Sequence, residues 1–188
     1  MSKILIFRHG ETDYNVEKRL QGFLDIPLNE RGKRQAKELS EKLKAEKIDL
    51  MYSSPLSRAL DTAKEILKGH PETELVLEKS LQERDFGKYA GTLKAELPEK
   101  FPELKGAELI NTWKSVDGRV ESYAEIRERV FPLLEKISEK ARKENINIAL
   151  STHKGPIRLA RMFFEKKTEE EVLDMHMAKN CQLWEYEV

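Results

Sequence analysis

Four short stretches of the sequence carry side chains that could bind and transfer a phosphoryl group. They are Arg8-His9-Gly10-Glu11-Thr12, Ser53-Ser54-Pro55-Leu56-Ser57-Arg58, Leu81-Gln82-Glu83-Arg84-Asp85 and Thr152-His153-Lys154-Gly155. Guanidinium groups match phosphate oxygens in pairs, a neutral imidazole nitrogen can attack phosphorus, and a carboxylic acid can protonate a leaving oxygen. The set therefore favours phosphoryl chemistry, although residue types alone do not decide which histidine attacks.

Each of these residues also has a purely structural interpretation. Arg58 could pair with Asp61 or Glu65 on its own helix, and Glu83 could be one more solvated charge. A single histidine beside a strand is more often structural than catalytic. Two histidines without a carboxylate at ligand spacing do not predict a metal site. The functional interpretation depends on the four stretches occurring together at successive strand ends.

Short apolar strands alternate with amphipathic helices along the chain, which predicts an α/β fold with a mainly parallel sheet. Strands are expected at residues 4–7, 48–52, 74–77, 146–151 and 182–188, the last at a sheet edge, and helices at 30–46, 55–68, 122–141 and 155–164. In such sheets ligands bind beyond the carboxyl ends of the strands. The four stretches fall there.

Several residues predict where the helices begin and bend. Asn29 is expected to cap the first long helix, and Ser54 the next one with Pro55 at its first position. Ser122 opens a capping box for a third helix. Pro132 lies inside that helix and predicts a kink.

We expect a single domain over residues 1–188, with one insertion. Residues 88–118 contain Pro98, Pro102, Gly106 and Gly118, which predict short helical pieces. Such an insertion often forms a lid or wall over a site. We expect Trp113 within it to influence which leaving group is accepted.

Composition excludes several classes of protein. Thirty-four basic and 34 acidic residues give zero net charge, which argues against a bulk nucleic-acid binder. Apolar runs such as residues 4–7 are too short to span a membrane, and we expect no signal peptide. The single cysteine, Cys181, favours the cytoplasm. The charged fraction of 36%, mostly Glu and Lys, is typical of thermophilic sources.

The order and local sequence of the four stretches resemble the histidine phosphatase superfamily, in its phosphoglycerate-mutase-like branch. Residues 8–12 with Asn15 match the signature R-H-G-E-T-x-x-N. The resemblance covers nearly the whole chain. It continues through residues 20–22, 25–28, 32, 35–36, 53–59, 62–63, 81, 83, 86–87, 91 and 151–155. All four stretches in order are far more specific than the first signature alone.

The resemblance implies a three-layer α/β/α sandwich, no metal and no cofactor. It implies that His9 becomes phosphorylated and that Glu83 is general acid and then general base. It also implies that Arg8, Arg58 and His153 hold the phosphoryl oxygens. We further expect contacts with the substrate, a small phosphate ester, from Asn15, Thr12, Gln21, Thr152 and Lys94.

A phosphatase is favoured over a phosphoglycerate mutase. Glu83 and His153 are 70 residues apart, whereas known mutases have a longer insertion there and a C-terminal tail over the site. Lys94 resembles a mutase substrate-binding lysine and keeps that alternative open. A third alternative is a binding module without catalysis, although the complete residue set argues against it. The particular ester and the oligomeric state stay undetermined.

Three positions depart from the family pattern. Arg119 and its neighbours replace a frequent Gly-Gly-Glu-Ser turn, Lys154 stands where glycine is frequent, and Tyr89 replaces a common tryptophan. Lys154 could add positive charge near the phosphate or could face solvent. Arg119 could point into the site, although a solvated loop position is the simpler interpretation.

Overall fold

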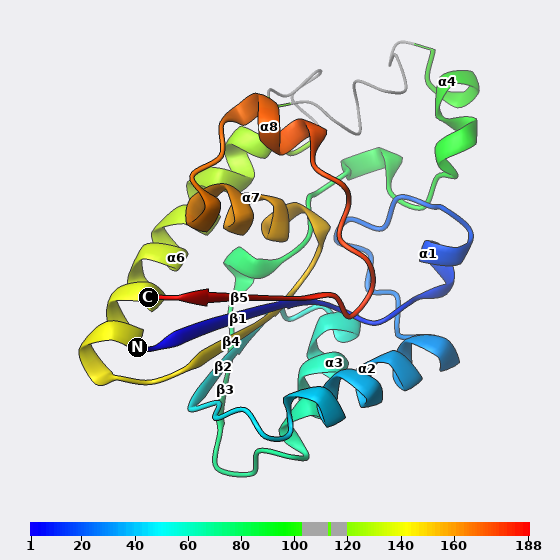
Figure 1. The fold of residues 1–188 in the computed structure, drawn as a ribbon. Helices are drawn as coiled ribbons and strands as arrows, with labels where there is room; N and C mark the ends of the chain where they lie inside the picture. The colour runs from blue at the N-terminus through cyan, green and yellow to red at the C-terminus, as the bar shows by residue number, and fades with distance from the viewer. Residues whose placement is uncertain (103–112, 114–119) are drawn as a thin grey trace.

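The computed structural model describes residues 1–102, 113 and 120–188. A five-stranded sheet with the order β3-β2-β4-β1-β5 forms its centre (Figure 1). The strands are β1 (Lys3–Arg8), β2 (Leu50–Ser53), β3 (Glu74–Leu77), β4 (Ile148–Thr152) and β5 (Leu183–Glu187). All neighbours are parallel except β5, which pairs antiparallel with β1 at the edge. The expected α/β class with a mainly parallel sheet is confirmed, and each strand lies within two residues of its predicted position.

Helices cover both faces of the sheet. On one face lie α2 (Glu30–Leu43) and α3 (Ser57–Leu67), and on the other α6 (Tyr123–Glu144) and α7 (Lys154–Glu165) (Figure 1). The shorter helices are α1 (Asp13–Val16), α4 (Leu97–Lys100) and α8 (Glu169–Asp174). None of the helices in the described part of the chain is both long and apolar enough to cross a membrane.

The two cores are built from alternate residues of the same strands. In β1, Ile4 and Ile6 pack with α6 and α7, whereas Leu5 and Phe7 pack with α2 and α3. All four are at most 1% exposed. This burial on both faces explains why the strand lacks polar alternation. Each such side chain stabilises the fold by about 1.5–3 kcal/mol relative to exposure.

Two of the predicted helix starts are confirmed. The Asn29 side chain accepts a hydrogen bond from the Gly32 amide (2.8 Å) at the start of α2, which ends at Leu43, three residues earlier than predicted. Ser122 forms the expected capping box at α6. That helix continues through Pro132 without a break, and the kink stays a prediction.

The predicted start of α3 is wrong. The helix begins at Ser57, with Leu56 rather than Ser54 at its N-cap. The Ser54 hydroxyl instead lies 2.8 Å from Nε2 of His153. The Ser57 amide donates to the Asp25 carboxylate (2.7 Å), so a distant loop supplies the partner that a local cap would have supplied.

The described part of the insertion has the expected short pieces. These are two 3₁₀ turns (Gly87–Tyr89 and Lys94–Glu96) and α4. Residues 103–112 and 114–119, which include Arg119, Gly106 and Gly118, lie outside the described residues. Trp113 is half-buried against the core beneath α6 and α7, and its carbonyl accepts a hydrogen bond from the Ala124 amide (3.1 Å).

Candidate active site

Parallel pairing of β1 and β4 brings the two predicted histidines together. Arg8 is in register with Thr152, so the residues that follow each strand emerge side by side. The His9 and His153 ring centroids are 5.0 Å apart, with an interplanar angle of 55°. Both side chains are buried, at 1% and 0% exposure. The sheet thus joins residues 144 positions apart in the sequence.

Local contacts fix the tautomer of His9. Its Nδ1 lies 2.6 Å from the Gly10 carbonyl oxygen, which can only accept, so Nδ1 carries the proton and Nε2 keeps a lone pair. Burial lowers the pKa of His9 well below its ordinary value, and Arg8 and Arg58 lower it further. The loop packs so tightly that a Cβ on Gly10 would lie 2.4 Å from the Gly32 carbonyl oxygen. His9 is therefore a neutral imidazole held in one orientation.

Two buried guanidinium groups flank the histidines. Arg8 donates to the Ala178 carbonyl (2.9 Å), and Arg58 donates to the Gly22 and Leu24 carbonyls (both 2.8 Å). The Nε of each arginine is buried and has no partner among the described residues. Burial lowers the pKa of each to about 10, so both remain charged at neutral pH. Charged donors of this kind suit an anion such as a phosphoryl group.

His153 is the second imidazole of the site. Its Nε2 lies 2.8 Å from the Ser54 hydroxyl oxygen. Its Nδ1 is buried and has no hydrogen-bond partner among the described residues. Burial, followed by the nearby Arg58, lowers the pKa of His153 well below its ordinary value. When the hydroxyl donates to Nε2, Nδ1 bears a proton that can be donated to a phosphoryl oxygen.

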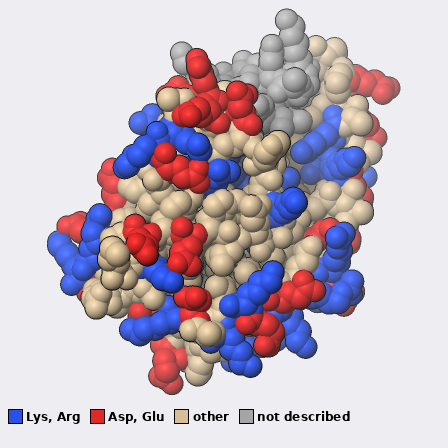
Figure 2. All heavy atoms as spheres, in the orientation of Figure 1, with Lys and Arg blue, Asp and Glu red and all other residues tan. Residues whose placement is uncertain are grey.

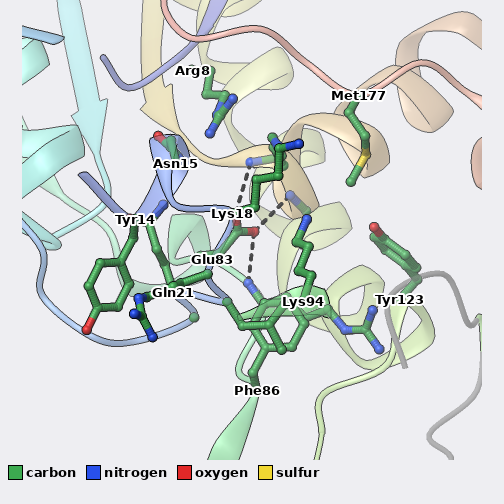
Figure 3. A pocket seen from close by; sticks show the side chains of 16 residues that line it. Arg8, Tyr14, Asn15, Lys18, Gln21, Glu83, Phe86, Lys94, Tyr123 and Met177 are labelled. Carbon is green, nitrogen blue, oxygen red and sulfur yellow. Dashed lines mark hydrogen bonds between the residues drawn. The ribbon is translucent and has the colours of Figure 1, made fainter. Parts of the chain in front are cut away.

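The Glu83 carboxylate is held at the amino end of α7. It accepts hydrogen bonds from the backbone amides of Arg84 (3.0 Å), Lys154 (3.2 Å) and Gly155 (2.9 Å), drawn as dashed lines in Figure 3. A Cβ on Gly155 would lie 2.8 Å from Glu83 Oε1, so glycine permits this approach. Strand-end geometry had predicted that Glu83 meets the loop after β4, and the structure brings them together.

Arg129, which the sequence analysis missed, holds the loop that carries Glu83. It donates to the backbone carbonyls of Ser80 (2.6 Å), Gln82 (2.9 Å) and Glu83 (3.1 Å). It also forms an ion pair with Glu121 (2.7 Å). No local signal marks Arg129 among the many charges of α6, because the carbonyl groups that it binds lie 46 to 49 residues earlier.

Asn180 was also missed. Its Nδ2 donates to the His9 carbonyl (3.1 Å) and the Asn15 side chain (3.0 Å), and its Oδ1 accepts from Arg8 (3.3 Å). One amide thereby links the end of β1 to α1. The spacing of 165 residues to Asn15 explains why no sequence pattern indicated this role.

The predicted substrate-contact residues divide into two groups. Asn15, Gln21 and Lys94 line a cavity of about 190 Å³ together with Arg8 and Glu83 (Figure 3). Thr12 and Thr152 do not line it. Thr12 caps α1 and donates to Gln21 (3.0 Å), and Thr152 donates to the Leu81 carbonyl (2.7 Å). His9, Arg58 and His153 are not among the lining residues either, which agrees with their burial.

The cavity differs from the outer surface in charge. On the face seen in Figure 2, basic and acidic side chains are interspersed around an uncharged area. The described lining of the cavity contains six cations, Arg8, Lys18, Arg19, Arg84, Lys94 and Lys154, and a single acid, Glu83. Within the residues described, no three His, Cys, Asp or Glu side chains gather as metal ligands would. The cavity suits an anion.

Comparison with known proteins identifies the class. The family model of the histidine phosphatase superfamily (branch 1) matches residues 4–188, and the chain belongs to this superfamily. The resemblance seen in the sequence is thereby confirmed, and the enzyme class is narrowed to phosphatases and mutases.

Some relatives are named as phosphatases and others as phosphoglycerate mutases or mutase-like proteins. The chain is 36% identical to phosphoserine phosphatase 1 of Hydrogenobacter thermophilus, over 84% of this chain and 74% of that protein. It is also 36% identical to phosphoglycerate mutase-like protein 4 of Arabidopsis thaliana, over 84% and 68%. A mycobacterial glucosyl-3-phosphoglycerate phosphatase, solved with VO3, superposes with a TM-score of 0.86 at 25% identity, over 98% and 90%.

Proposed function

We propose that the protein is a metal-independent phosphatase that hydrolyses small phosphomonoesters through a phosphohistidine on His9. The observation that carries this proposal is the His9 tautomer, which leaves Nε2 as a neutral nucleophile beside two buried guanidinium groups. The names of several relatives support a phosphatase. We place the activity in the cytosol, because a single cysteine suits a reducing compartment.

In the first step Nε2 of His9 attacks the phosphorus atom. The bond from phosphorus to the leaving oxygen breaks as the bond from phosphorus to nitrogen forms. Glu83, protonated at this stage, gives its proton to the leaving oxygen, so the product departs as an alcohol. Arg8 and Arg58 neutralise charge on the equatorial oxygens, and the neutral His153 donates a hydrogen bond to one of them. Removing one such donor typically costs about 10²–10³ in rate.

In the second step the Glu83 carboxylate takes a proton from a water molecule. The resulting hydroxide attacks phosphorus, the bond to Nε2 breaks, and inorganic phosphate leaves. Glu83 is then protonated again and His9 is neutral again, which closes the cycle. Three backbone hydrogen bonds hold the Glu83 carboxylate in one place, where it can act as the acid in the first step and as the base in the second.

Phosphate release by the wild type and by His9→Ala tests this proposal. With EDTA present, the wild type should release inorganic phosphate from small esters, and His9→Ala should not. His176→Ala, at an exposed histidine, is the matched control and should behave as the wild type. Mass spectrometry at alkaline pH should find one phosphoryl group on His9. Phosphate release by His9→Ala would contradict His9 as the nucleophile. A wild type with neither phosphate release nor a trapped phosphohistidine would favour a binding module.

A phosphoglycerate mutase is the second candidate, because Lys94 lies in the cavity as a substrate-binding lysine would. A mutase passes the phosphoryl group back to the bound intermediate instead of to water. Interconversion of 2- and 3-phosphoglycerate, primed with bisphosphoglycerate, distinguishes the two. Interconversion faster than phosphate release would favour the mutase.

A further inference from the structure

We infer that Lys94 and Lys154 form a second anion site beside Glu83, so that the preferred substrate carries a negative charge on its leaving group. This inference rests on the proposed phosphatase function and specifies its substrate class. The anion is a carboxylate or a second phosphate, and both present oxygens that an ammonium group can bind.

The first argument is that neither lysine forms an ion pair within the described residues. Arg19 forms an ion pair with Glu17 and donates to the Gly91 carbonyl, so its charge already has a partner. In the described part of the chain, the ammonium groups of Lys94 and Lys154 form neither a hydrogen bond nor an ion pair. Both side chains are half-buried, unlike an ordinary solvated lysine. Half-burying a cation without a partner is unfavourable.

The second argument is the charge balance with substrate in place. A phosphoryl group carries about −1.5 to −2 charges at neutral pH, which Arg8 and Arg58 can match. Glu83 is the one acid left among the described lining residues, and it must be protonated to act as a general acid. At that moment nothing in the described lining neutralises the two lysines. An anion on the leaving group would do so.

The third argument is position. Lys154 opens α7, and its own backbone amide holds Glu83, so its side chain starts next to the proton donor. Lys94 begins the 3₁₀ turn Lys94–Glu96, which lies on a different part of the cavity lining. Figure 3 shows Lys94 and Glu83 pointing into the same pocket. The leaving oxygen must sit beside Glu83 to receive its proton. The rest of the leaving group therefore lies near both lysines.

The electrostatics agree with this placement. Burial lowers the pKa of Lys154 to about 8, and Arg8 and Lys94 act in the same direction. Burial also lowers the pKa of Lys94. Glu83 raises the pKa of both lysines but does not outweigh burial, so the cavity disfavours its own ammonium groups until an anion binds. Lys154 replaces a glycine that is frequent in the family, so this charge is a property of the present chain.

Matched substrate pairs test the inference. Glycerol 3-phosphate and 3-phosphoglycerate differ by one carboxylate, and fructose 6-phosphate and fructose 1,6-bisphosphate differ by one phosphate. We expect kcat/KM to favour one anionic member by roughly 10- to 100-fold, the effect of a charge-assisted hydrogen bond. The pair that shows the preference identifies the anion. Equal kcat/KM within both pairs would overturn the inference.

Variants of Lys154 and Lys94 test whether these lysines cause the preference for an anionic leaving group. Lys154→Gln should reduce the preference to near unity, and Lys154→Arg should retain most of it. Lys136→Gln removes an exposed lysine of α6 and should leave the preference unchanged. A preference that survives in folded Lys154→Gln and in Lys94→Gln would overturn the assignment. The absence of any His9-dependent phosphate release would instead overturn the proposed function, so the two failures are distinguishable.

Discussion

At the scale of single residues, the buried histidines determine how the protein responds to acid. The pKa of His9 lies well below its ordinary value, so His9 stays neutral as the pH falls through 6.5. We therefore expect kcat/KM to show no acidic loss centred near 6.5. A pH profile of kcat/KM checks this. A loss of kcat/KM centred near pH 6.5 and absent from the unliganded substrate's own titration would contradict a neutral His9.

The same histidines should make stability depend on pH. The folded pKa values of His9 and His153 are lower than the unfolded ones, so the unfolded chain binds more protons below about pH 6.5. Stability is then complete above pH 7 and falls by roughly 1.4 kcal/mol per pH unit per histidine below 6.5. Urea unfolding at pH 7.5 and 5.5 measures this. His9→Asn should show a smaller difference, and an equal difference would contradict the assignment.

Lys154 adds a third prediction. With a pKa of about 8, its ammonium charge is lost as the pH rises from 7 to 9. The groups that act on it are Arg8, Lys94, Glu83 and Arg158. The preference for an anionic leaving group should decline over this range, as the ratio of kcat/KM within a matched pair would show. A ratio that stays constant to pH 9 would argue against Lys154.

At the scale of elements, α6 holds the loop of Glu83, the proposed general acid, through Arg129. We expect Arg129→Met to lower kcat roughly 10- to 100-fold on alkyl phosphates, because small misplacements of a catalytic group have effects of that size. The loss should be smaller on p-nitrophenyl phosphate, whose leaving group needs little protonation. Arg127→Met, at an exposed position of the same helix, is the control. Equal losses on both substrates would indicate general destabilisation instead.

Local patterns predicted the elements well, and long-range contacts explain the exceptions. The run of residues 4–7 identified β1 because both of its faces are buried. Ser54 was misassigned as a cap because its partner, His153, is 99 residues away. Arg129 and Asn180 were missed for the same reason. The residues just after the strands could be predicted to meet because the carboxyl ends of parallel strands lie at the same edge of the sheet.

At the scale of the whole molecule, ion pairs are numerous on the helices. Examples one helical turn apart are Lys140 with Glu144 (2.7 Å), Lys143 with Glu139 (2.6 Å) and Arg161 with Glu165 (2.8 Å). Isolated exposed pairs contribute little at 25 °C, but the desolvation penalty falls at high temperature. We expect a thermal midpoint above the roughly 45–65 °C of mesophilic domains. Calorimetry checks this, and a midpoint inside that range would contradict a thermophilic source.

The position of β1 has a consequence for how the protein is made. This strand is synthesised before its sheet partners β4 and β5, which lie more than 140 residues later. The side-chain amide of Asn180, just before β5, then forms hydrogen bonds with Arg8, His9 and Asn15. Such distant pairings make folding slow. A nascent chain therefore carries His9, the proposed nucleophile, long before its site is complete, and the site is completed only when the segment with Asn180 and β5 docks.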